Sequence, residues 1–182
     1  MAFTLAKGVT TTVVTLSAAT TKYGTGATGT VAGSSGGTVS VTVGGTFTLP
    51  ASLVPGSYAV VASYSGSDLD EPSTSTVTYT VTKAASKATV SVPAKGTSGK
   101  SVTVTVKVAG VAQGVAPTGK VTIKLGAKTV AKVTVPASGK ITKKVKLAGA
   151  GAKKVTVTYS GDGKYGASSA AKSVKVVKAK KK

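Results

Sequence analysis

The stretch Tyr159-Ser160-Gly161-Asp162 decides the fold, because a near copy, Tyr64-Ser65-Gly66-Ser67, occurs earlier in the chain. The two tyrosines stand at positions 64 and 159, which gives a period of 95 residues. Each tyrosine ends a run of alternating apolar and polar residues, 58–64 and 154–159, of the kind that forms a β-strand. A repeat of this period predicts two tandem domains, each of the size of one β-sandwich.

The correspondence between the two copies extends upstream of the tyrosines. Gly37-Thr38-Val39-Ser40-Val41 aligns with Gly119-Lys120-Val121-Thr122-Ile123, but the distance to the tyrosine is 27 residues in the first copy and 40 in the second. We therefore expect the first domain to lack a hairpin. The additional length in the second copy is residues 124–138, where the alternation over 129–135 predicts a further strand. The last strand of each copy is predicted at residues 75–82 and 173–178.

Composition supports an all-β chain, because Val, Thr, Ser, Ala and 23 glycines dominate it. The predicted fold is two tandem immunoglobulin-like antiparallel β-sandwiches, residues 1–84 and 87–182, joined by a short linker at 82–87. Tyr64 and Tyr159 are expected to bury their rings at equivalent corners, with each hydroxyl satisfying a nearby backbone group. Asp162 is expected to hydrogen-bond its own turn.

The order of these motifs resembles the bacterial Ig-like domain family, which occurs as tandem repeats in actinobacterial surface proteins and as added domains of phage virion proteins. The resemblance covers nearly the whole chain and is strongest at Pro117–Val121 and Tyr159–Tyr165. It is weaker in the first copy, where Ser67 replaces the corner aspartate. It implies a fold and a setting, and it implies no reaction.

The reactive side chains are few, because the chain has no His, Cys, Trp, Arg or Asn and only four acidic residues. Catalytic triads, zinc sites and arginine clamps cannot be built from this inventory, so we predict no enzyme and no catalytic, cofactor or metal site. The run Asp68-Leu69-Asp70-Glu71 is predicted to form a solvated turn or an ion pair with lysines of the next domain. Calcium binding by its carboxylates is the alternative.

Charge is divided unequally along the chain. The part up to Ala85 has three lysines and three acidic residues, whereas the part after it has 21 lysines and one acid, Asp162, and a net charge of +20. Lysines alternate with apolar residues at 120–125 and 172–176, so they are expected to point outward from strands. A soluble, edge-protected surface is the simplest explanation. The restriction to one domain favours attraction to polyanions instead.

The predicted polyanion-binding residues share the lysine-rich domain and its C-terminal tail. They are Lys120, Lys124, Lys143, Lys144, Lys146, Lys153, Lys154, Lys180, Lys181 and Lys182. Readout of base sequence prefers Arg and Asn, and single-strand binding prefers stacked aromatics, so no sequence-specific nucleic-acid partner is predicted. An anionic cell-surface polymer fits point charges that need no fixed geometry.

Residues Met1–Gly8 show no basic leader followed by an apolar segment, and the chain has no long apolar run, so we expect no secretion signal and no membrane insertion. We expect a complete short gene product. These features favour a structural accessory protein of a bacteriophage virion, with the first domain on a capsid or tail subunit and the basic domain exposed. The alternative is a fragment of a secreted actinobacterial adhesin or wall-associated protein at the bacterial cell surface.

Overall fold

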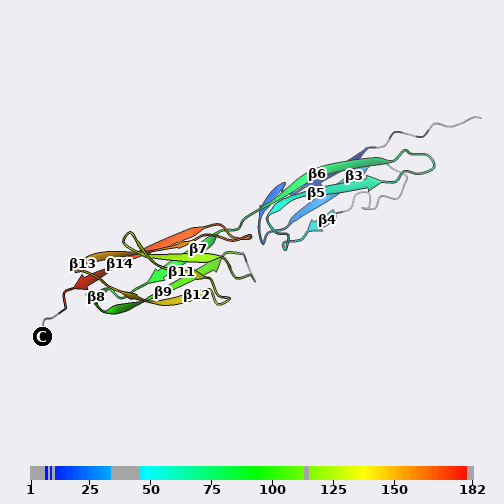
Figure 1. Cartoon of the computed structure of the whole chain (residues 1–182). Helices are drawn as coiled ribbons and strands as arrows, with labels where there is room; N and C mark the ends of the chain where they lie inside the picture. The colour runs from blue at the N-terminus through cyan, green and yellow to red at the C-terminus, as the bar shows by residue number, and fades with distance from the viewer. Residues whose placement is uncertain (1–6, 8, 10, 34–45, 113–114, 180–182) are drawn as a thin grey trace, which may run out of the picture. The chain divides into compact units, whose positions relative to one another are not determined.

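The computed structural model describes residues 7, 9, 11–33, 46–112 and 115–179, and every helix or strand assigned among them is a β-strand. The predicted all-β fold is therefore confirmed (Figure 1). The chain divides into two compact units, Met1–Thr82 and Lys83–Lys182. Each unit consists of two β-sheets with its own buried residues, so each is described by itself.

The second unit contains eight of the described strands, β7 to β14. They are β7 (Ser86–Ser91), β8 (Lys95–Thr97), β9 (Ser101–Gly110), β10 (Lys120–Leu125), β11 (Lys128–Thr134), β12 (Lys140–Lys146), β13 (Gly151–Tyr159) and β14 (Ser168–Val177). One sheet has five strands in the order β11-β10-β13-β14-β8, and the other has three in the order β12-β9-β7. Strands β11 and β12 are consecutive in the chain but lie at the edges of different sheets.

Alternating side chains explain why this unit forms a sandwich. On β9, Val104, Val106 and Val108 are buried, while Thr103 and Lys107, which alternate with them, are exposed. The same period of two buries Val121 and Ile123 on β10. Because successive strand residues point to opposite faces, the valines and isoleucines of both sheets fill one core and the polar residues face water.

The first unit has a smaller set of described strands. They are β1 (Thr12–Leu16), β2 (Thr20–Lys22), β3 (Ala27–Gly33), β4 (Thr46–Leu49), β5 (Gly56–Tyr64) and β6 (Ser73–Thr82). Two three-stranded sheets result, in the orders β1-β3-β4 and β2-β6-β5. Tyr23, Tyr64, Tyr79 and Val81 are buried, and Val14 and Phe47 pack against Tyr64.

The strands that the structure describes pair antiparallel apart from one short pairing in each unit. Strand β2 pairs in parallel with β6, and β8 pairs in parallel with β14. Each short strand lies beside the last strand of its unit and occupies the edge of that sheet. Covering the edge in this way hides backbone groups that would otherwise pair with another chain.

The additional strand predicted in the second copy is present. Strand β11 covers 128–134, one residue earlier than predicted, and forms a hairpin with β10 across a turn in which Gly126 has a φ of 60°. The expected counterpart of β10 in the first copy, at 37–41, lies outside the described residues. The absence of a hairpin from the first domain therefore stays a prediction.

The two tyrosine corners are confirmed as buried, with Tyr64 at 3% and Tyr159 at 0% exposure. The expected backbone partner of Tyr159 is corrected: its hydroxyl donates to the side-chain Oδ2 of Asp162, at 2.9 Å. Asp162 also accepts from the backbone N–H groups of Lys164 and Tyr165 through Oδ1, as expected for its own turn. The backbone N–H and the hydroxyl of Thr118, just before β10, donate to Oδ2. One carboxylate thus ties the corner to a neighbouring strand.

At the first corner, two residues together accept the tyrosine and turn hydrogen bonds that Asp162 accepts at the second. Ser67 stands at the position of Asp162, and its Oγ accepts from the backbone N–H groups of Leu69 and Asp70, both at 3.1 Å. The Tyr64 hydroxyl donates to Oδ2 of Asp70 at 3.4 Å. Asp70 therefore replaces the carboxylate that position 67 lacks.

Candidate polyanion-binding surface

The only acidic residue of the second unit is Asp162. Burial raises the pKa of its carboxyl, but hydrogen bonds from the backbone N–H groups of Thr118, Lys164 and Tyr165 and from the Tyr159 hydroxyl outweigh this and hold the pKa well below its ordinary value. Burial first, and then the hydrogen bond to Asp162 and its negative charge, raise the pKa of Tyr159 well above 10. The single side-chain carboxylate of this unit is therefore occupied by hydrogen bonds at the corner.

The outer face of the five-stranded sheet carries three of the predicted residues. Lys120 and Lys124 on β10 and Lys154 on β13 are exposed, as alternation with buried neighbours predicts. Thr156 on β13 lies directly opposite Lys124. The lysines of this face are therefore separated by short hydroxyl side chains, which leave the ammonium groups accessible.

The outer face of the three-stranded sheet carries two more predicted residues. Lys144 lies opposite Thr103 and Lys146 opposite Ser101, and all four are exposed. On the same face Lys140 lies directly opposite Lys107. Like charges that face each other across two strands destabilise the pair, and an anion placed between them relieves the repulsion.

Lys143 occupies an unusual position on β12. Its register partner is Val104, which is fully buried, and its neighbours on the same side of the strand are the buried Ile141 and Val145. Lys143 nevertheless stays exposed, because β12 is the edge strand of its sheet and the side chain has room to reach water. A charge at an inward position of an edge strand discourages pairing with another strand.

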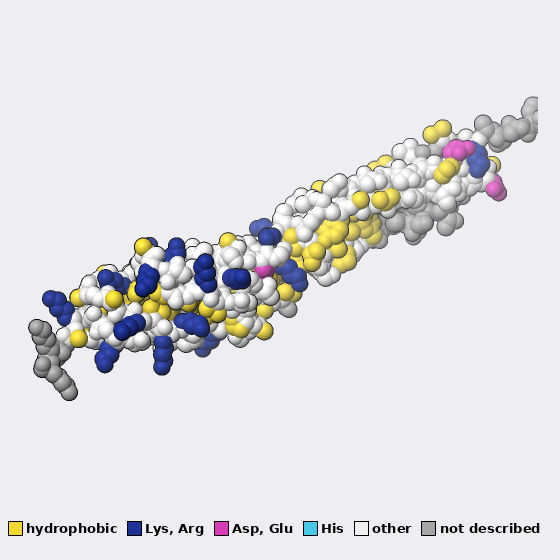
Figure 2. All heavy atoms as spheres, in the orientation of Figure 1, with side chains coloured by type: hydrophobic (Ala, Val, Ile, Leu, Met, Phe, Trp, Pro, Cys, Tyr) yellow, Lys and Arg dark blue, Asp and Glu magenta, His cyan; other side chains and the backbone are white. Residues whose placement is uncertain are grey.

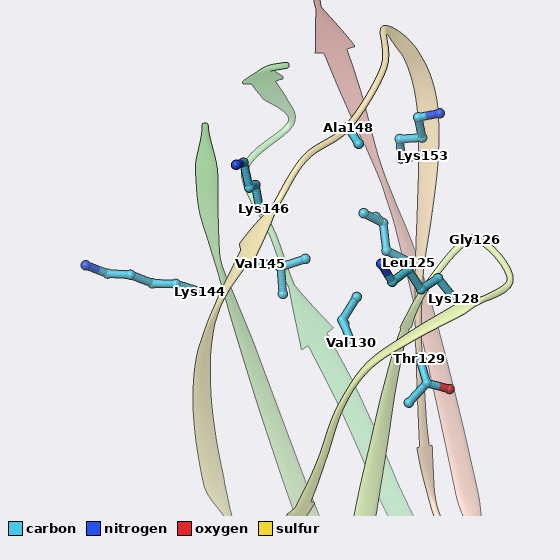
Figure 3. Close-up of a pocket in the computed structure, with 10 residues that line it drawn as sticks. All are labelled: Leu125, Gly126, Lys128, Thr129, Val130, Lys144, Val145, Lys146, Ala148 and Lys153. Atoms are coloured by element: carbon cyan, nitrogen blue, oxygen red, sulfur yellow. The ribbon is translucent and has the colours of Figure 1, made fainter. Parts of the chain in front are cut away.

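A groove of about 510 Å³ lies between the β10–β11 hairpin and β12. Leu125, Val130 and Val145 turn their side chains into it, as Figure 3 shows. Lys128 reaches from the hairpin toward Leu125, and Lys146 and Lys153 stand on opposite sides of one end. Lys144 extends away from the groove in the same view. The groove therefore combines an apolar floor with a cationic rim.

The predicted lysines do not form one site. The structure divides them between the outer faces of two sheets and the rim of the groove, and on the face drawn in Figure 2 lysines are spread along the second unit and are sparse on the first. Lys180, Lys181 and Lys182 lie outside the described residues. The prediction left out further lysines of these surfaces, among them those at positions 107, 128, 132, 140 and 175. In the sequence each of these is a single lysine within an alternating strand or at the end of a turn, which is a weaker indication of a binding surface than a run of lysines.

The acidic run of the first unit takes part in the hydrogen bonds of the first corner. Among the described residues no three His, Cys, Asp or Glu side chains are grouped so that they could hold a metal ion. Asp70 instead accepts from Tyr64 and Ser67. In the part of the chain that the structure describes, no helix has the length and hydrophobicity needed to cross a bilayer.

Two sheets packed with this strand order define an immunoglobulin-like β-sandwich. Residues 88–177 match the bacterial Ig-like domain (group 3), which confirms the expected resemblance over the second unit. Among solved structures, a tetra-tandem repeat from the extending region of a large adhesion protein is 20% identical, with a TM-score of 0.46 over 92% of this chain and 49% of that one. A D1–D4 ectodomain fragment of ICAM-5 is 11% identical, with a TM-score of 0.43 over 93% of this chain and 52% of that one. The chain thus spans about half the length of each of these structures. No match was found among curated proteins.

Proposed function

We propose that the chain is a non-enzymatic structural accessory protein whose second unit binds anionic polymers. The observation that carries this proposal is the excess of lysine on one unit whose single carboxylate is bound within the corner. A surface of this charge attracts polyanions from about a Debye length away, roughly 8 Å at physiological ionic strength. Lysine on both outer faces suits a long polymer that contacts the domain from more than one side.

The first unit supplies the attachment in this proposal. The part of the chain up to Ala85 has equal numbers of lysines and acids, so it approaches a protein surface without strong repulsion. Val54 and Val61 are about half exposed there and offer apolar contact. Attachment through such contacts is expected to change little with salt, in contrast to polymer binding by the second unit.

The proposed carrier is a bacteriophage virion, with a capsid or tail subunit as the partner of the first unit. A bacterial cell surface, with acidic wall polymers as partners, is the alternative carrier. The two carriers differ in where the protein is found after infection and fractionation. Antibody labelling of purified particles supports the virion, and labelling confined to the wall fraction of uninfected cells supports the surface protein.

The binding proposal is tested with the full chain and a soluble polyphosphate or purified teichoic acid. Tight binding at low salt that weakens steeply as salt rises is the expected result, since exposed charges are screened. A neutral polysaccharide of similar length is the matched control and should not bind. If the full chain does not bind polyanions at low salt, the lysines serve solubility and the proposal is wrong.

A further inference from the structure

We propose that the groove between the β10–β11 hairpin and β12 binds an anionic amphiphile, namely a phosphate or carboxylate group that carries an alkyl chain. This inference rests on the proposed function, because the ligand is an anion, and it adds the requirement for an apolar part. The groove is defined by Leu125, Val130 and Val145 on its floor and Lys128, Lys146 and Lys153 on its rim.

The apolar floor is incompletely covered by the protein itself. Val121, Ile123 and Leu125 follow one another on the inward side of β10, and the first two are fully buried, whereas Leu125 is only half-buried. The register with β11 shifts between Ile123 and Lys124, and the chain turns at Gly126 directly afterwards. The hairpin therefore ends before the other sheet covers Leu125. An alkyl chain placed here removes apolar surface from water on both sides of the contact.

Among the described residues of the second unit, no side-chain carboxylate lies near the cationic rim. Lys153 lies near the start of β13, and Asp162 follows the end of that strand. At the usual rise of a strand, nine residues span roughly 30 Å, which is several Debye lengths at physiological ionic strength. The charge of the rim is therefore complementary to an external anion. Lysine ammonium groups suit a phosphate or carboxylate that enters in more than one orientation.

The groove differs from the outer faces of the two sheets because it combines both features. The outer faces of the two sheets present lysines among Thr and Ser side chains, so they attract anions without regard to an apolar part. In the groove, Val130 and Val145 come from edge strands of different sheets and face the same space (Figure 3). A ligand that carries both an anionic group and an alkyl chain therefore distinguishes this site from those outer faces.

The test uses the full chain and a series of soluble probes: inorganic phosphate, ethyl phosphate, butyl phosphate and hexyl phosphate. Affinities come from titrations followed by amide chemical shifts, which also locate the binding residues. Each methylene that enters the groove should strengthen binding roughly three- to fourfold, the change that about 0.8 kcal/mol per buried methylene corresponds to. The largest shifts should fall on residues 125–130 and 145–153.

Matched variants separate the apolar part from the charge. Val130→Ser should remove most of the dependence of affinity on the length of the alkyl chain. If that variant is unstable, Val130→Thr tests the same contact with a smaller change in the side chain. Lys128→Gln and Lys153→Gln should weaken binding of every probe. Lys120→Gln removes one exposed charge from the outer face of the same sheet and should leave the chain-length dependence unchanged.

The outcomes separate this inference from the proposed function. Equal affinity for all phosphates, or a chain-length dependence that survives unchanged in Val130→Ser and Val130→Thr, would overturn the groove proposal. Polyphosphate binding that persists in that case would leave the proposed function standing. If the full chain does not bind polyphosphate but binds alkyl phosphates in the groove, the polymer proposal is overturned and the groove proposal stands.

Discussion

The Tyr159 hydroxyl lies 2.9 Å from Oδ2 of Asp162, whereas at the first corner the Tyr64 hydroxyl lies 3.4 Å from Oδ2 of Asp70. The shorter bond lies within the ordinary range for a hydroxyl donor and a charged acceptor, and the longer one lies outside it. Asp162 also accepts hydrogen bonds from Thr118 and from the turn that follows Asp162 in the chain. The second corner is therefore the better-bonded of the two.

Replacing Tyr159 tests the contribution of this corner. Tyr159→Ala removes a fully buried ring and one of the hydrogen bonds to Asp162, so the free energy of unfolding of the second unit should fall by about 3 to 5 kcal/mol. Tyr58→Ala is the control, because Tyr58 is only half-buried and its hydroxyl bonds a single exposed carbonyl, that of Val54. Denaturant titration of the full chain measures both. Equal stability of Tyr159→Ala and the wild type would contradict the assignment of this ring to the core.

The sequence was sufficient to predict the burial of Tyr159, the turn that Asp162 bonds and the alternation of the strands. It did not predict that the Tyr159 hydroxyl donates to the Asp162 side chain, since a backbone partner was expected. The replacement of the missing aspartate by Asp70 was not predicted, because it follows a change of loop shape rather than of residue type. The short parallel strands β2 and β8 were also missed, since a three-residue strand is too short to show alternation.

The groove was beyond sequence reasoning for a different reason. Its floor joins Val130 and Val145, whose strands are edges of different sheets and share no register. Lysines could be predicted to face outward from the period of two alone. Which of them share a face depends on strand order, and the inward position of Lys143 depends on β12 being an edge.

The acid stability of the second unit should depend on Asp162. Its pKa is lowered in the folded state, so it stabilises that state fully above the unfolded pKa of about 3.9, and the contribution is lost progressively as the pH falls below that value. Asp162→Asn should therefore lower stability at pH 7 by about 1 to 3 kcal/mol, and the difference from wild type should shrink between pH 5 and pH 2. Thermal unfolding at a series of pH values measures it. A difference that is constant over this range would show that the charge of Asp162 contributes nothing.

Glycines of the second unit should differ sharply in their tolerance of alanine. Gly161 has a φ of 80°, and a Cβ there would lie 2.8 Å from the carbonyl oxygen of Tyr165, so Gly161→Ala carries both backbone strain and a clash. Gly99 has a φ of 81° with nothing near an added Cβ, and Gly163 has neither problem. Gly161→Ala should lower the free energy of unfolding by more than about 2 kcal/mol, and Gly99→Ala by about 1 to 2 kcal/mol. Gly163→Ala should lower it by less than about 0.5 kcal/mol. Chemical unfolding of each variant gives the ranking, and a Gly163→Ala loss as large as that of Gly161→Ala would contradict it.

Polymer binding by the lysine surface should be distributed and without a dominant residue. Two matched triple variants divide the surface, Lys120, Lys124 and Lys154 to Gln on the five-stranded sheet and Lys107, Lys140 and Lys144 to Gln on the three-stranded sheet. Each removes three exposed charges, and an exposed ion pair contributes at most about 1 kcal/mol, so single changes should weaken polyphosphate binding slightly and each triple by roughly ten- to a hundredfold at low salt. Both triples should also reduce the slope of affinity against salt concentration, because fewer counterions are released. The full chain titrated with polyphosphate at several salt concentrations provides the measurement. If one triple abolishes binding while the other has no effect, the polymer contacts a single face, and the account of binding from both outer faces is wrong.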